Sequence, residues 1–164
     1  MKKLAVAFTG PSNSGKTTLI TKVATILLET NQVAIIKNDP KDKANFDTKG
    51  KDSYKFSQTG AETVVVSPTR TTYFSQKSRS LDELIMMLGD FDFLLVEGLK
   101  TLPLPRIAIF REKIDESYFA SSNAIAIDES VDISLYDIPS HIQLLDLNDP
   151  KAVISWIFDN AKKV

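Results

Sequence analysis

Short apolar runs, separated by longer stretches of mixed character, dominate the pattern of the chain. Within each run the apolar residues are almost continuous rather than alternating with polar ones. Such runs are typical of strands that are buried on both faces of a largely parallel sheet. The runs lie at residues 4–8, 33–36, 64–66, 93–96, 107–110, 124–127 and 144–147.

Between several of these runs, apolar residues recur at helical spacing. Ser80 and Glu83 form a capping-box pattern, and Asn148 or Asp149 precedes Pro150 at the start of the last such stretch. Strands that alternate with helices predict an α/β fold with right-handed crossovers. The helical stretches are residues 18–30, 80–88 and 148–163.

Two segments interrupt this alternation. Residues 39–48 are too polar for a core, and we predict a loop that is either functional or mobile. Residues 69–75 are rich in β-forming residues and partly alternate. We expect them to form an extra strand outside the main sheet, which pairs across a homodimer because a free strand edge favours a partner.

Composition narrows the classes of function. The chain has 20 Lys and Arg against 21 Asp and Glu, a net charge of −1, which argues against nucleic acid as the main partner. Cysteine is absent and His141 is the single histidine, which excludes thiolate and His-rich metal sites. The first apolar run is too short for a signal peptide, and no run approaches the roughly 20 residues of a membrane span. We expect a cytoplasmic protein without a membrane partner.

Residues 10–17 match the phosphate-loop (Walker A) pattern G-x-x-x-x-G-K-[ST] between a predicted strand and a predicted helix. Backbone N–H groups of such a loop point at phosphates, and the helix N-terminus adds its positive dipole end. Lys16 would reach the β- and γ-phosphates, and the Thr17 hydroxyl would bind Mg²⁺. The predicted nucleotide-binding residues are Gly10, Pro11, Ser12, Asn13, Ser14, Gly15, Lys16, Thr17 and Thr18.

The phosphate-loop motif makes the fold prediction more specific. We expect residues 1–164 to form a single nucleotide-binding domain with the three-layer αβα P-loop NTPase fold, a mostly parallel sheet and a β extension. Glu97 ends the apolar run 93–96, at the edge where open α/β sheets bind ligands. It would hold Mg²⁺ or position an attacking water, so Lys16 and Glu97 are the candidate catalytic residues. Alternatively, Glu97 is a solvated strand-terminal residue.

Further motifs follow the loop motif at residues 7–19 in a fixed order. Gly50-Lys51-Asp52-Ser53-Tyr54 is followed by the run 64–66, and then comes Leu94-Leu95-Val96-Glu97-Gly98-Leu99-Lys100 with the run 107–111. This order and spacing resemble the MobB family of P-loop GTPases, the molybdopterin-guanine dinucleotide biosynthesis adaptor proteins. The resemblance implies binding of GTP with Mg²⁺, weak GTP hydrolysis and homodimerisation. It also implies cooperation with the molybdenum cofactor guanylyltransferase, with molybdopterin as a further candidate ligand.

The resemblance adds candidate residues. Lys51 and Asp52 would contact the γ-phosphate or the substrate of the partner; alternatively, they begin a short helix and are solvated. Asp47 is a second candidate Mg²⁺ ligand. Residues 37–49 lack the histidines of this stretch in the family, so no role of those histidines is transferred.

Other interpretations stay open at this point. A small-molecule kinase or ATP-dependent ligase could use the same scaffold, although no arginine-rich lid is evident. A scaffold that binds nucleotide with incidental turnover is a third possibility. No Asn-Lys-x-Asp guanine signature occurs, so GTP rests on the resemblance alone. The basic residues Arg70, Lys100, Arg106 and Arg111 follow predicted strands, and we expect each to be solvated.

Overall fold

The computed structural model describes residues 2–164, which divide into two compact units. The first unit contains the residues up to Asn38 together with 90–164, and the second contains residues 39–89. The first unit carries the phosphate loop. One domain over residues 1–164 stays a prediction.

A mostly parallel sheet forms the first unit, as predicted for the α/β class. The strand order is β2-β5-β1-β6-β7-β8, and every pair along it is parallel. The short strand β9 pairs antiparallel with the start of β1; the sequence had indicated the end of a helix there. The strands are β1 (Leu4–Thr9), β2 (Val33–Lys37), β5 (Phe93–Glu97), β6 (Arg106–Phe110), β7 (Ala124–Ile127), β8 (Gln143–Asp146) and β9 (Lys162–Lys163).

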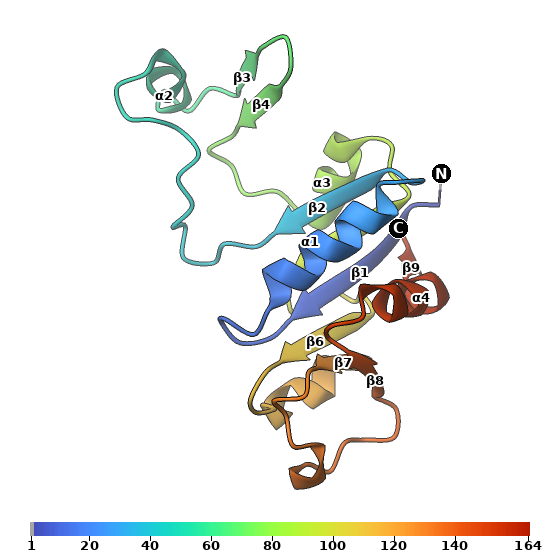
Figure 1. Cartoon of the computed structure of the whole chain (residues 1–164). Helices are drawn as coiled ribbons and strands as arrows, with labels where there is room; N and C mark the ends of the chain where they lie inside the picture. Colours follow the sequence, from blue (N-terminus) through green and yellow to red (C-terminus); the bar gives the residue numbers. More distant parts are fainter. Residues whose placement is uncertain (1) are drawn as a thin grey trace. The chain divides into compact units, whose positions relative to one another are not determined.

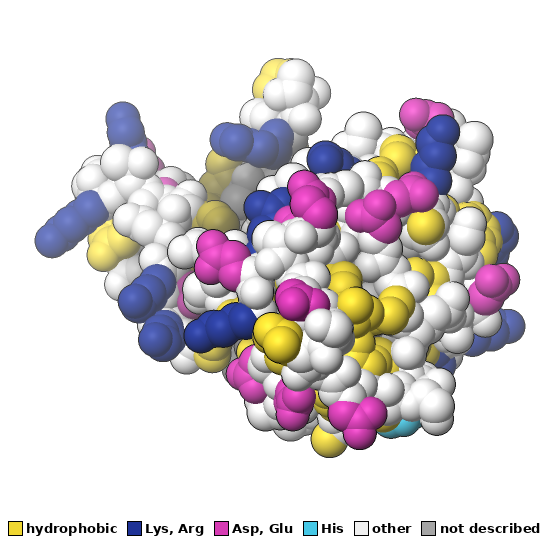
Figure 2. Space-filling view, turned by 60° about the horizontal axis from the view of Figure 1, so that its bottom comes forward, with side chains coloured by type: hydrophobic (Ala, Val, Ile, Leu, Met, Phe, Trp, Pro, Cys, Tyr) yellow, Lys and Arg dark blue, Asp and Glu magenta, His cyan; other side chains and the backbone are white. Residues whose placement is uncertain are grey.

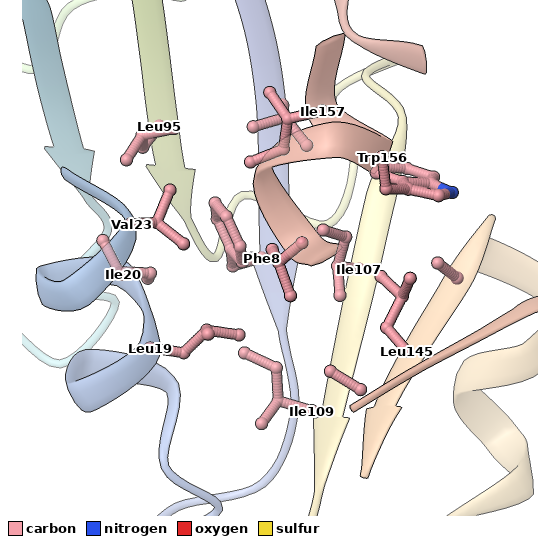
Figure 3. Close-up of a cluster of buried hydrophobic side chains, with 14 of the residues drawn as sticks. Phe8, Leu19, Ile20, Val23, Leu95, Ile107, Ile109, Leu145, Trp156 and Ile157 are labelled. Atoms are coloured by element: carbon pink, nitrogen blue, oxygen red, sulfur yellow. The ribbon is translucent and has the colours of Figure 1, made fainter. Parts of the chain in front are cut away.

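Helices α1 (Lys16–Leu27) and α4 (Pro150–Asn160) cover one face of this sheet, as Figure 1 shows. Between the helices and the strands lies a closely packed apolar core (Figure 3). Trp156 and Ile157 of α4 are 3% and 0% exposed, so the indole is a core residue. The Asp149 side chain caps α4 by accepting hydrogen bonds from two backbone N–H groups, as predicted.

The opposite face of the sheet supports a second apolar cluster. Phe110 and Ile125 project from β6 and β7 and pack with Phe119 of the 3₁₀-helix η1 (Glu116–Ser121). A second 3₁₀-helix, η2 (Ile133–Leu135), follows β7. Both sides of β6 and β7 are therefore covered, which explains their unbroken apolar sequences.

The second unit contains α2 (Asp52–Ser57), α3 (Leu81–Leu88) and a separate antiparallel pair, β3 (Thr63–Val66) with β4 (Thr71–Phe74). Ser80 and Glu83 form the predicted capping box at α3, and β4 is the predicted extra strand.

The prediction that residues 64–66 belong to the buried parallel sheet is wrong. Val64 and Val66 are 54% and 74% exposed, because β3 pairs with one short strand only. Valine favours an extended backbone in a buried strand and in an exposed one, so a run of valines does not show that a strand is buried.

Over residues 2–164, no helix is both long enough and apolar enough to cross a membrane.

Replacement of Ile157 by alanine tests the core between α4 and the sheet. The side chain is fully buried, so we expect Ile157→Ala to lower the free energy of unfolding by about 2–5 kcal/mol. Chemical denaturation monitored by circular dichroism measures this change. The exposed Lys151→Ala on the same helix serves as control and should stay within about 0.5 kcal/mol of the parent chain. Equal effects of the two substitutions would contradict the packing described.

Candidate nucleotide-binding site

The carboxyl ends of β1, β2 and β5 meet at one edge of the sheet. Phe8 of β1 is in register with Glu97 of β5, and Lys37 of β2 is in register with the same glutamate. The phosphate loop leaves β1 after Thr9, one residue beyond Phe8, so Glu97 lies on the strand beside its first residues. Parallel α/β sheets bind their ligands at this edge.

The phosphate loop turns tightly against β6. Gly10 has a φ of +139°, and a Cβ placed on it would lie 2.4 Å from the carbonyl oxygen of Ile109, so no side chain fits there. Asn13 and Gly15 also have positive φ values, 63° and 97°, and Gly15 immediately precedes α1. Amides in such turns form an anion-binding concavity that the helix N-terminus reinforces. The Ser14 hydroxyl is buried with no hydrogen-bond partner among residues 2–164.

Lys16 folds back over its own loop. Its Nζ donates hydrogen bonds to the carbonyl oxygens of Gly10, at 3.0 Å, and Pro11, at 2.6 Å. Burial lowers the pKa of Lys16 below its ordinary value; Glu97 opposes this shift and Lys37 adds to it. The ammonium group is thus held at the loop, with a carboxylate near enough to influence its charge.

Glu97 lies between two lysines rather than in open solvent. Its side chain is 17% exposed, and its Oε2 lies 3.8 Å from the Lys37 Nζ. Close backbone packing fixes this strand end, because a Cβ on Gly98, where φ is +87°, would lie 3.0 Å from the Cβ of Asn38. Lys37 was not predicted as a site residue. The signal was available, since Lys37 ends an apolar run whose carboxyl end reaches the same edge.

The loop after Glu97 is held by a buried arginine. Arg106 is 1% exposed, and its guanidinium donates to the carbonyl oxygens of Gly98, Leu99, Lys100 and Leu102 at 3.0–3.3 Å. Burial lowers the pKa of this guanidinium. The prediction that Arg106 is solvated is therefore wrong, because the loop folds over the start of β6 and offers its carbonyl groups.

Beside the loop lies a cavity of about 310 Å³ that brings five of the predicted binding residues together with one that was not predicted, Arg111. Arg111 follows β6, and its Nε lies 3.1 Å from the Oδ2 of Asp128. The Arg111 side chain is 44% exposed, which agrees with the prediction that it is solvated. The cavity is lined by Asn13, Gly15, Lys16, Thr17, Thr18 and Arg111.

No cluster of three or more metal-ligating side chains occurs in the described part of the chain. Mg²⁺ in phosphate-loop proteins does not require one, because it keeps several waters and binds phosphate oxygens with one or two protein ligands. Thr17 lines the cavity beside Lys16, and Glu97 lies close enough to raise the pKa of Lys16. These two residues fit a magnesium ion that arrives with a nucleotide.

Acidic and basic side chains are interspersed on the face of the molecule that Figure 2 shows. The net charge of −1 offers no general attraction for anions, so the predicted phosphate binding depends on the local geometry of the loop.

Comparison with known proteins identifies the family. Residues 5–129 match the family model for MobB, molybdopterin guanine dinucleotide synthesis protein B. The chain belongs to the MobB family. An Escherichia coli molybdopterin-guanine dinucleotide biosynthesis adapter protein is 27% identical over 96% of this chain and 93% of its own length. A Methanocaldococcus jannaschii protein with a similar description is 31% identical over 73% of this chain and 53% of its own length.

The fold agrees with this assignment. The crystal structure of Bacillus subtilis MobB superimposes with a TM-score of 0.76 at 24% identity, covering 98% of this chain and 99% of that one. The MobB match favours the adapter interpretation over a small-molecule kinase or ligase.

The remaining predicted site residues of this MobB-family chain lie in the second unit. Asp47 accepts hydrogen bonds at Oδ1 from the Ser53 hydroxyl and the Thr48 N–H, while its Oδ2 is buried without a partner among residues 2–164. Lys51 immediately precedes α2, and Asp52 in its first turn pairs with Lys55 at 3.4 Å. The roles of Asp47, Lys51 and Asp52 toward nucleotide or Mg²⁺ stay predictions.

Replacement of Arg106 tests how the loop after Glu97 is held. Arg106→Met removes the side-chain donor from four partly buried carbonyl groups, of which those of Leu99 and Leu102 keep a backbone donor, so we expect the free energy of unfolding to fall by about 3 kcal/mol. Arg106→Lys keeps the charge but cannot span the same acceptors, and should recover only part of the loss. Arg70→Met removes an exposed arginine as control and should change stability by less than about 0.5 kcal/mol. Similar values for both methionine variants would refute the role assigned to Arg106.

Proposed function

We propose that this MobB-family chain binds GTP with Mg²⁺ at the phosphate loop and serves as an adapter in molybdopterin guanine dinucleotide synthesis. The observation that carries the proposal is the loop itself. Gly10 lies so close to the Ile109 carbonyl that no side chain is tolerated, and Lys16 is folded over the loop. This geometry suits a polyphosphate and has no evident structural purpose of its own.

The residues at the sheet edge have distinct tasks in this proposal. Backbone N–H groups of residues 10–18 hold the phosphates, and the Lys16 ammonium exchanges its loop carbonyls for phosphate oxygens. Bound Mg²⁺ supplies charge neutralisation for the phosphates, with Thr17 and Glu97 as its candidate protein ligands. Glu97 also suits the orientation of an attacking water, because its carboxylate is largely withdrawn from solvent. We assign a weak GTPase activity to this arrangement.

The proposed partner follows from the family. Relatives such as the Escherichia coli protein are named adapter proteins, which implies an enzyme that they serve. We propose the guanylyltransferase that joins GMP to molybdopterin as this enzyme, with molybdopterin as a ligand of the assembled complex. The nucleotide held by the adapter contains the same guanine nucleotide unit that the enzyme transfers.

We also propose that the chain forms a homodimer through the hairpin of β3 and β4. This pair forms a sheet of two strands only, and isolated two-stranded sheets are marginally stable in water. Val64 and Val66 expose apolar surface along β3. A second copy that pairs with a free edge would satisfy its backbone groups and cover these valines.

Lys16→Ala tests the loop assignment. Loss of the ammonium group should reduce the affinity for Mg²⁺-GTP by at least about 100-fold, because it removes a charge-assisted contact to phosphate in a partly buried site. Isothermal titration calorimetry measures the affinity, and the melting temperature checks the fold. Lys22→Ala, on the exposed side of the same helix, removes the same charge and should bind GTP like the parent chain. Equal binding by Lys16→Ala would refute the assignment.

Sedimentation at micromolar concentration tests the homodimer. We expect a dimer for the parent chain and a monomer for Val66→Lys, because a charge on a strand edge opposes pairing. Met86→Lys places the same charge on the equally exposed α3 and should remain a dimer. A monomeric parent chain would rule out the proposed pairing.

A further inference from the structure

Arg111 lies against the phosphate loop from the neighbouring strand. Its guanidinium carbon is 3.4 Å from the position that a Cβ on Gly15 would occupy. It lines the cavity of about 310 Å³ together with Lys16, Thr17 and Thr18. A basic side chain therefore borders the site opposite the amides of the loop and the start of α1.

One side of the guanidinium is anchored. Its Nε forms an ion pair with the Oδ2 of Asp128 at 3.1 Å, and the Asp128 side chain is only 12% exposed. The other oxygen, Oδ1, accepts hydrogen bonds from the N–H and the hydroxyl of Ser130. Asp128 follows β7, the strand beside β6, so the anchor belongs to the sheet rather than to a free loop.

The backbone at Arg111 is held in an uncommon conformation. Glu112 has a φ of +64°, and the Lys113 N–H donates to the Arg111 carbonyl oxygen at 2.7 Å, which forms a tight three-residue turn of the rare, positive-φ kind. The Glu112 N–H donates to the Ser130 hydroxyl at 2.8 Å. One serine therefore braces both the strained turn and the carboxylate that orients Arg111. Strain of this type is typical of functional sites.

The outer end of the guanidinium remains available. Arginine has five N–H donors. Arg111 pairs with Asp128 through its Nε, and its terminal nitrogens donate no hydrogen bond within residues 2–164. Its terminal nitrogens are free to form the paired hydrogen bonds that arginine makes with phosphate oxygens. An exposed ion pair that served stability alone would contribute little, and would not need a braced, strained turn.

We propose that Arg111 contacts the α- and β-phosphates of the nucleotide and that Asp128 is its positioning residue. The assignment to these phosphates follows from the shared cavity, because the amides at the start of α1 hold the α- and β-phosphates. The inference rests on the proposed nucleotide binding and adds the residue that distinguishes a nucleoside diphosphate from a monophosphate. GDP and GTP should depend on Arg111 equally.

A double-mutant cycle tests the proposal on the full-length chain. The affinities for Mg²⁺-GDP and Mg²⁺-GTP are measured by calorimetry for the parent, Arg111→Ala, Asp128→Asn and the double variant. We expect Arg111→Ala to weaken both nucleotides by about 10–100-fold, and Asp128→Asn to weaken them less. In the double variant the Asp128→Asn change should have no further effect, a coupling that a purely structural role of Asp128 would not produce.

Controls separate this proposal from the nucleotide site itself. Arg111→Lys can still pair with Asp128, so it should retain the melting temperature of the parent chain. A lysine cannot form the paired hydrogen bonds that a guanidinium makes with phosphate, so this variant should bind nucleotide more tightly than Arg111→Ala but more weakly than the parent chain. Lys22→Ala should bind like the parent chain, and Lys16→Ala should bind at least about 100-fold more weakly. If Lys16→Ala binds as the parent does, the loop assignment fails. If Lys16→Ala binds this weakly while Arg111→Ala matches the parent, or loses GTP affinity alone, only the proposal for Arg111 is overturned.

Discussion

The contact between Gly10 and the Ile109 carbonyl is the constraint on which the site depends. At 2.4 Å from a Cβ position, it permits only glycine and fixes where the chain leaves β1. The loop can then turn through Asn13 and Gly15, both at positive φ, into α1. Every charged group discussed above is useful only because the backbone is placed first, by the pairing of β1 with β6.

Charge at the site is balanced before any ligand binds. Lys16 is satisfied by its own loop carbonyls, and Glu97 faces Lys37. Arg111 is paired with Asp128, and Arg106 is surrounded by backbone carbonyl groups. A binding site with several cations can thus persist without anion, because each cation has a partner of opposite or partial negative charge. In the proposed complex, a polyphosphate would exchange some of these contacts rather than meet uncompensated charge.

Features that depend on neighbouring residues could be predicted from the sequence. The phosphate loop, the Ser80–Glu83 capping box and the Asp149 cap all rest on local hydrogen bonds within a few residues. Features that depend on the register between distant strands could not be predicted from the sequence. Arg111 and Asp128 meet only because β6 and β7 pair with their ends aligned, and no local pattern reports that. The antiparallel strand β9 and the exposure of β3 were missed for the same reason.

The parallel order of the sheet also affects how the site can be made. Gly10 and Ile109 are roughly a hundred residues apart in the chain, and Glu97 is almost as distant from the loop that it adjoins. During synthesis, the N-terminal strand and loop must wait for β5 and β6 to emerge before either flank is covered, a non-local closure of the kind that slows folding. A nascent chain that ends before β6 has the complete Walker sequence but no surface to shape it. The proposed nucleotide binding would therefore report that translation has passed β6 and that the sheet has closed.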